Sequence, residues 1–144
     1  LNVNQDHPEC YRSLAVLLTE QGRHEKAFDM LEYWKKRSPA SADPSVELAR
    51  LHREAGDKEA SEKHLLDAIA ADNSDPRART ALGMLHEEAG DYQQAIKHYN
   101  VALSRNRSQP HLQSRVARLS GSSQPGSRSG STRFARVPAP NRQY

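Results

Sequence analysis

The 144-residue sequence predicts an all-α fold, an α-solenoid of three helix hairpins followed by one capping helix. Residues 42–75 align without a gap with 76–109, identical at 11 of 34 positions, and 8–41 fits the same frame. Apolar residues in each copy recur at spacings of three and four, which places them on one face of a helix. A glycine interrupts each copy between two such faces. A 34-residue period therefore indicates one helix–turn–helix unit per copy.

Each copy is expected to contain two helices joined at its glycine, which can take the left-handed conformation that closes the first helix. Asp57 and Asp91 follow two of these glycines and can cap the second helix. Asp43-Pro44 and Asp75-Pro76 have the composition of a capped helix start. The expected helices are 8–21, 24–37, 42–55, 58–71, 76–89 and 92–105.

Small residues at matching register positions let the paired helices approach closely. Ala15, Ala49 and Gly83 share one position in the first helix of each copy, and Ala27, Ser61 and Ala95 share one in the second. A larger side chain at either position would push the two helices apart.

Segment 110–119 begins one period after Pro76 and carries a single apolar stripe of Leu112, Val116 and Leu119. We expect it to cover the flank of the last hairpin as a capping helix. Residues 1–119 are thus predicted to form one repeat domain. Residues 120–144 are rich in Ser, Gly, Pro and Arg, which predicts a flexible tail.

The third copy resembles the tetratricopeptide repeat (TPR) through Leu82-Gly83, Gly90-Asp91-Tyr92, Ala95, Tyr99 and Ala102, and Pro39 stands where that family often ends a repeat. The resemblance covers about 8–109 and implies a right-handed solenoid. It also implies a protein-interaction role without catalysis. Three departures concern packing: Ser45 and Arg79 replace a large apolar residue, and Trp34 replaces a small one.

The resemblance implies that a ligand binds to the concave face, which the first helix of each copy forms. The candidate groove residues are Arg12, Val16, Glu20, Glu47, Arg50, Arg53, Arg77, Thr80, Met84 and Glu87. Seven acids and four bases occupy the exposed first-helix positions, so a mildly acidic groove is expected. Some TPR domains hold the C-terminal carboxylate of a chaperone with Lys, Asn and Arg. Val16, Glu47 and Ala81 stand at three of those positions, which disfavours that role here.

Charge is divided between the two parts of the chain. Residues 105–144 contain eight arginines and no Asp, Glu or Lys, whereas residues 1–104 carry a net charge of −5. Tail residues Arg128, Arg133, Phe134 and Arg136 could bind nucleic acid or another polyanion, dock in the acidic groove, or belong to a linker. The sequence leaves these three alternatives open.

No pattern for catalysis, cofactor binding or metal binding is present. His52 and His86, like His64 and His98, are equivalent in adjacent copies and about 10 Å apart, which is too far to share a zinc ion with bonds of about 2 Å. Cys10 lacks a paired base and is expected to be a half-buried packing residue. Trp34 is expected in the core. No run of about eighteen apolar residues predicts a membrane span.

The sequence therefore predicts a non-catalytic adaptor that binds a peptide segment of another protein in its concave groove. Two alternatives remain: an accessory protein that binds a polyanion or nucleic acid through its arginine-rich tail, and a scaffold fragment of a larger protein. Neither the partner nor the compartment can be read from the residues.

Overall fold

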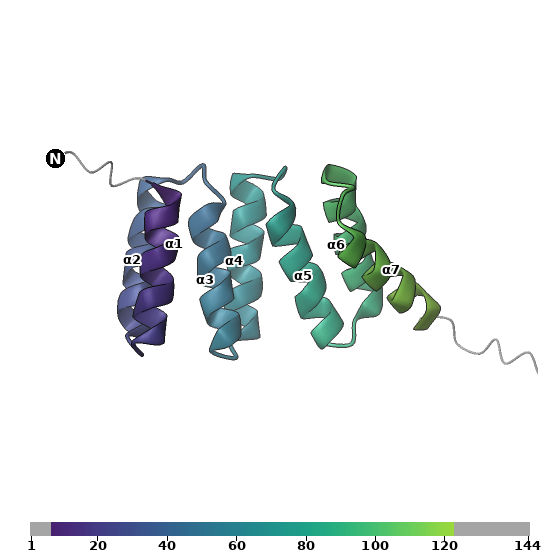
Figure 1. Ribbon diagram of the computed structural model, residues 1–144, viewed down its shortest axis with the longest axis horizontal. Helices are drawn as coiled ribbons and strands as arrows, with labels where there is room; N and C mark the ends of the chain where they lie inside the picture. The colour runs from purple at the N-terminus through teal and green to yellow at the C-terminus, as the bar shows by residue number, and fades with distance from the viewer. Residues whose placement is uncertain (1–6, 123–144) are drawn as a thin grey trace, which may run out of the picture.

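The computed structural model describes residues 7–122, which form seven α-helices and no strand (Figure 1). The helices are α1 (Pro8–Glu20), α2 (His24–Arg37), α3 (Asp43–Glu54), α4 (Lys58–Ala71), α5 (Pro76–Glu88), α6 (Tyr92–Arg105) and α7 (Pro110–Ser122). The first six form three hairpins and α7 follows singly. The predicted all-α solenoid of three hairpins with a capping helix is confirmed.

The hairpins stand side by side in chain order. In Figure 1, α1, α3 and α5 form a front row, and α2, α4 and α6 lie behind them. Each second helix packs against its own partner and against the first helix of the next hairpin, and α7 packs on α6. Consecutive elements are therefore neighbours in space, as a 34-residue repeat requires.

The turns between paired helices follow the prediction. Gly22, Gly56 and Gly90 have φ of 71°, 83° and 81°, the left-handed conformation that glycine adopts without a steric penalty. The carboxylates of Asp57 and Asp91 accept hydrogen bonds from backbone N–H groups in the first turns of α4 and α6, and thereby satisfy donors without a partner in the helix.

One predicted cap is wrong. Asp75 caps α5 by accepting from the N–H of Arg77, but Asp43 lies inside α3, and Ala42 precedes that helix without a side-chain cap. The Asp43 carboxylate instead contacts the guanidinium groups of Arg12 and Arg77, which come from the hairpins before and after it. These charged partners outcompete the local N–H groups.

The core is divided into three clusters along the stack. The first includes Trp34, which is buried as predicted and stacks on Tyr11 with ring centroids 4.8 Å apart. In the second hairpin, the Ser61 hydroxyl donates to the Ala49 carbonyl at 2.8 Å. A serine therefore fits at a position where the other hairpins have alanine, because its hydroxyl has a partner.

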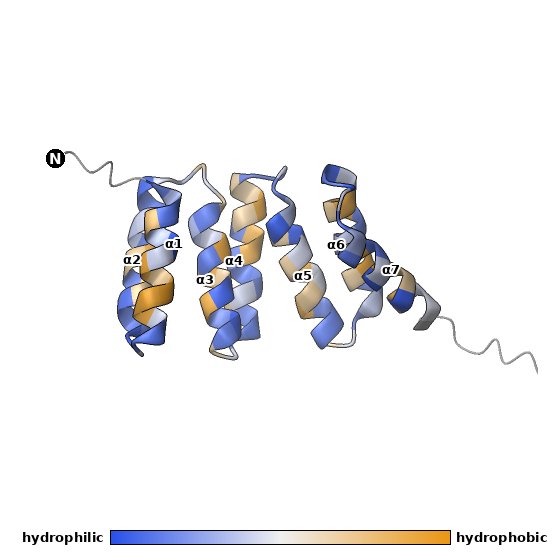
Figure 2. Cartoon of the chain, in the orientation of Figure 1, coloured by the Kyte–Doolittle hydropathy of each residue, from blue (hydrophilic) through white to orange (hydrophobic). Residues whose placement is uncertain are grey.

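The two ends of the stack differ. Leu14 and Leu17 of α1 are 45% and 50% exposed, whereas their equivalents in α3, Leu48 and Leu51, are 0% and 3% exposed. The difference arises because α2 covers α3, and no helix of the described chain precedes α1. Figure 2 colours part of α1 as hydrophobic.

The other end is covered by α7. Leu112 and Leu119 are buried against α6 and Val116 is half-buried, as the predicted stripe requires. The helix extends to Ser122, three residues beyond the predicted 110–119. None of the helices in the described range 7–122 is long and apolar enough to cross a membrane.

Candidate functional site

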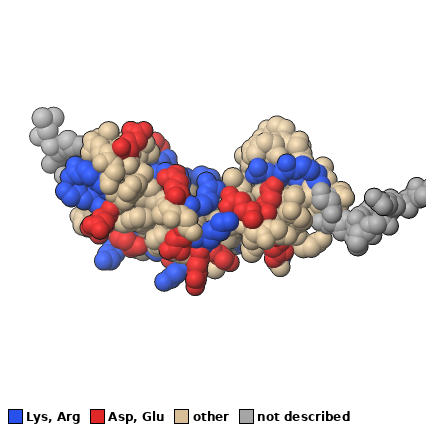
Figure 3. Space-filling model, turned by 90° about the horizontal axis from the view of Figure 1, so that it is seen from below, with Lys and Arg blue, Asp and Glu red and all other residues tan. Residues whose placement is uncertain are grey.

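The helix stack is hollowed on one side, between its N-terminal and C-terminal parts (Figure 3). A pocket of about 450 Å³ lies between α3 and α5, with residues of α4 in its wall and the α6–α7 loop at one end. This volume is within the range of about 300–1,000 Å³ that is usual for ligand sites.

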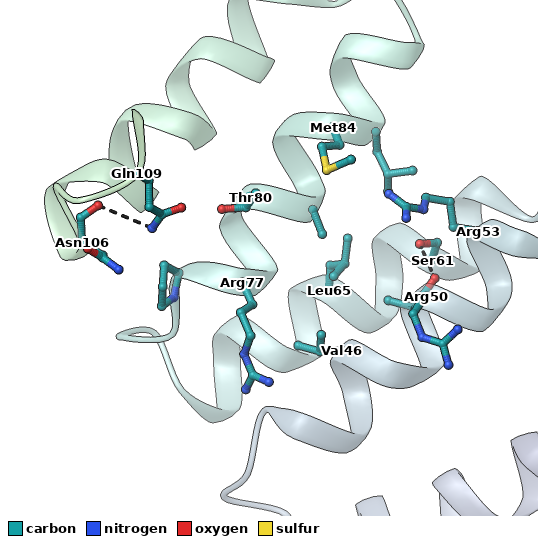
Figure 4. Close-up of a pocket in the computed structure, with 14 residues that line it drawn as sticks. Val46, Arg50, Arg53, Ser61, Leu65, Arg77, Thr80, Met84, Asn106 and Gln109 are labelled. Carbon is teal, nitrogen blue, oxygen red and sulfur yellow. Dashed lines mark hydrogen bonds between the residues drawn. The ribbon is translucent and has the colours of Figure 1, made fainter. Parts of the chain in front are cut away.

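The pocket has an apolar lining. Its apolar residues come from α3, α4 and α5, and they are Val46, Ala49, Leu65, Ala81, Met84 and Leu85. Figure 4 shows Val46, Leu65 and Met84 facing the same space. They meet there because α3 and α5 occupy equivalent places in successive hairpins, and α4 fills the gap behind them.

The charged residues that line the pocket are three arginines, Arg50, Arg53 and Arg77, and no acid lines it. The expectation of a mildly acidic groove is therefore wrong for this pocket. Three of the acids counted from the sequence, Asp43, Glu47 and Glu54, lie beside it and pair with arginines. The Nε of Arg50 donates to Glu47 at 3.0 Å, and its Nη1 donates to Glu54 at 2.7 Å.

Arg53 differs from the other two arginines. Its side chain is half-buried and forms no hydrogen bond or ion pair with any residue in 7–122. Arg77, in contrast, contacts both Asp75 and Asp43, and its Nη2 lies 2.6 Å from Oδ1 of Asp43. Arg53 is thus the lining cation that has no counter-charge within the described chain.

The ten predicted groove residues fall into two groups. Five of them line the pocket: Arg50, Arg53, Arg77, Thr80 and Met84. The other five lie outside it: Arg12, Val16, Glu20, Glu47 and Glu87. Val16 and Glu20 are exposed on α1, one hairpin away from the pocket.

Arg12 and Glu47 belong to an ion-pair network beside the pocket. Arg12 contacts Asp43, and its Nε lies 3.6 Å from Oε1 of Glu47. Burial alone would raise the pKa of Asp43, but the guanidinium groups of Arg77 and Arg12 hold it below its usual value. This network links all three hairpins at one rim of the groove.

Glu87 connects α5 to the C-terminal helices. Its carboxylate accepts from the Tyr99 hydroxyl at 2.7 Å and from Nη2 of Arg118 at 2.6 Å, and Nε of Arg115 lies 3.2 Å away. Burial and the hydrogen bond to Glu87 raise the pKa of the Tyr99 hydroxyl. With three partners, this carboxylate positions α7 and is not turned toward the pocket.

Nine pocket residues are not among the predicted candidates, and four of these lie outside α3 and α5: Ser61, Leu65, Asn106 and Gln109. The first two belong to α4, a second helix, and lie in the gap between α3 and α5. Asn106 and Gln109 lie in the loop that leads into α7. The in-phase Pro110 is the sequence signal that could have placed this loop beside the start of α5.

Histidines pair within hairpins. The rings of His52 and His64 stack with centroids 5.1 Å apart, and those of His86 and His98 stack at 5.3 Å. Each pair joins the first helix of a hairpin to the second. Within residues 7–122, no three His, Cys, Asp or Glu side chains are grouped as metal ligands.

Two other expectations concern Cys10 and the tail. Cys10 is exposed, not half-buried as predicted, because no helix of residues 7–122 packs on the outer face of α1. The tail candidates Arg128, Arg133, Phe134 and Arg136 lie outside the described residues.

A tetratricopeptide-repeat family model matches residues 46–110. A search of curated proteins returned no match.

The solved structures similar to this chain include the following three. The first TPR domain of Spaghetti (RPAP3), bound to the HSP90 peptide SRMEEVD, aligns with a TM-score of 0.69 and 15% identity over 80% of this chain and 94% of that one. For the first TPR domain of human RPAP3 the TM-score is 0.68, with 15% identity over 79% and 90% of the two chains. For MamA it is 0.65, with 19% identity over 84% and 66%. At these identities the structures support the fold.

Proposed function

Because the chain carries tetratricopeptide repeats, we propose that it is a non-catalytic adaptor that binds a peptide segment of another protein in its concave groove. Repeats of this kind form a protein-interaction fold. One structural neighbour was solved with a peptide of HSP90, which supports a peptide as the kind of ligand.

The observation that carries the proposal is the pocket of about 450 Å³ between α3 and α5. It combines an apolar lining with a few polar groups, the composition expected of a site that buries a ligand side chain. An anchor in a desolvated pocket supplies much of the affinity in protein interfaces. The pocket also lies along the row of first helices, where a groove of this kind is expected, and this supports the proposal.

Selection of peptides from a random display library on the full chain tests the proposal. Peptides that bind in the groove should lose most of their affinity for a Thr80→Trp variant, because the indole would fill the pocket that Thr80 lines. Glu59→Trp is the matched control, since Glu59 is exposed on α4 in the rear row. If no peptide is enriched, or if the two variants bind the selected peptides equally well, groove binding is wrong.

A chain that ends at Ser122 separates the groove from the arginine-rich tail. Peptide binding in the groove should survive this deletion. If the deletion abolishes partner binding, and binding to the full chain weakens steeply with salt, the polyanion-binding alternative is the better explanation.

A further inference from the structure

We propose that the pocket binds an acidic peptide segment, with a large apolar side chain inserted between α3 and α5 and a neighbouring Asp or Glu side chain paired with Arg53. This inference rests on the proposed function and adds the chemistry of the ligand. Its two parts depend on different residues and can be tested separately.

The apolar part follows from the lining. Six apolar side chains from three helices converge on one space, and the polar hydroxyl of Ser61 is already bonded to the Ala49 carbonyl. The lining around Leu65 therefore offers apolar contact and requires no hydrogen bond from a ligand. A Leu, Met or Phe side chain would remove this surface from water at little polar cost.

The acidic part follows from Arg53. Arg53 is a half-buried residue, and no acid of the described chain pairs with its guanidinium. A carboxylate from the ligand would supply that partner, with the fork geometry that makes such hydrogen bonds strong. Arg50 and Arg77 already pair with acids of the chain, although the buried Nη2 of Arg50 has no hydrogen-bond partner in residues 7–122. Arg53 is therefore the lining arginine whose charge a ligand can neutralise.

The positive charge in the pocket lining disfavours a basic ligand. A basic segment would bring further positive charge to Arg53, which no acid of residues 7–122 neutralises, and would find no acid in the lining. For the same reason, an arginine-rich segment such as the chain's own tail is a poor occupant. Charge complementarity thus favours an acidic partner over a basic one.

The position of the pocket favours an internal segment over a chain end. The pocket lies midway along the stack, with the first hairpin on one side and α7 on the other (Figures 1 and 3). An extended segment can therefore continue in both directions from the anchored side chain. Carboxylates within such a segment come from Asp or Glu side chains.

The peptides recovered by display provide the first test. They should contain a large apolar residue with Asp or Glu within about three positions, a separation that an extended chain of about 3.3–3.6 Å per residue can span. Peptides that bind in the groove but lack this acidic neighbour would overturn the inference and leave the proposed function intact. Failure to recover any peptide would overturn both.

A double-mutant cycle provides the second test. The Glu or Asp of the best peptide is changed to Gln or Asn, and affinities are measured by isothermal titration calorimetry for the wild-type chain and for Arg53→Gln. We expect the change to weaken binding to wild type by about tenfold and to have little effect on Arg53→Gln. An equal loss for both proteins would show that Arg53 is not the partner.

Two further variants are controls for net charge and for the apolar anchor. Arg23→Glu changes the charge as much as Arg53→Glu, but Arg23 lies in the α1–α2 turn, away from the pocket. Arg53→Glu should reverse the preference so that a Lys peptide binds better than its Glu counterpart, and Arg23→Glu should not. Changing the apolar residue of the peptide to Ala should weaken binding to wild type and to Arg53→Gln alike.

Discussion

The ring of Tyr99 occupies the space beside Gly83 that any larger residue would need. A Cβ added to Gly83 would lie 2.6 Å from Cδ1 of Tyr99, well inside contact distance. The equivalent pairs in the other hairpins are Ala15 with Leu31 and Ala49 with Leu65. The third hairpin therefore accommodates its larger aromatic side chain by giving up a methyl group on the opposing helix.

Gly83→Ala should destabilise the chain. Overpacking of this kind costs about 1–3 kcal/mol, which exceeds the gain of up to about 1 kcal/mol from replacing a helical glycine with alanine. Urea denaturation followed by circular dichroism measures the change. Gly121→Ala in α7 is the control and should not destabilise, because an added Cβ there meets no atom within 4 Å. Equal stability of Gly83→Ala and wild type would contradict the packing of Tyr99.

Equivalent leucines should differ in their contribution to stability. Leu48→Ala removes a fully buried side chain and should lower the free energy of unfolding by about 2–5 kcal/mol. Leu14→Ala changes the same register position at the uncovered end and should cost less than about 1 kcal/mol. Chemical denaturation of both variants measures the difference. Similar losses would mean that another part of the chain or a second molecule covers Leu14.

Glu87→Ala should loosen α7. The substitution removes the acceptor of the Tyr99 hydroxyl and the counter-charge of Arg115, so a buried hydroxyl loses its partner at a cost of about 1–3 kcal/mol. Hydrogen exchange should increase first in residues 110–122. Glu88→Ala is the matched control, because Glu88 is exposed and contacts Lys58 at 3.4 Å. Unchanged exchange in α7 would show that its apolar stripe alone holds it.

Stability should fall as the pH drops below about 6.5. Burial, with contributions from Lys35 and His52, lowers the pKa of His64, and burial and His86 lower that of His98. The neutral rings are therefore favoured in the folded chain, so their contribution is complete above the unfolded pKa and is lost as pH falls through the folded values.

Urea midpoints between pH 8 and pH 5 measure this loss. The urea midpoint of a double variant, His64→Gln with His98→Gln, should depend less on pH in this range. The difference between its midpoint and that of wild type should therefore narrow as the pH falls. A constant difference would show that the paired histidines do not cause the acid sensitivity. The lowered pKa of Asp43 concerns a more acidic range, in which its contribution is lost as the pH falls below its usual value of 3.8.

The repeat, its turns and its capping helix could be predicted because their signals are local. The left-handed turn at Gly56 needs only a residue without Cβ, and the stripe on α7 needs only its own spacing. Such features depend only on residues within one 34-residue copy. They are then repeated, so each copy supports the interpretation of the others.

The sign of the charge in the pocket lining could not be predicted in the same way. Counting charges by register position treats Glu47 and Arg50 as separate contributors, whereas they neutralise each other in the structure. Asp43 has the local sequence of a helix cap but contacts arginines 31 and 34 residues away. These pairings depend on how neighbouring hairpins stack, and no spacing within one copy encodes them.

The exposed leucines of α1 indicate which end of the helix stack should unfold first. Within residues 7–122, the first hairpin contacts a neighbour on one side, whereas the second contacts neighbours on both sides and the third is closed by α7. In a linear array, stability is the sum of the units and of the contacts between them, so the unit with fewest contacts opens at the lowest free energy. Unfolding should therefore start at α1 and α2 and reach the hairpins around the pocket last.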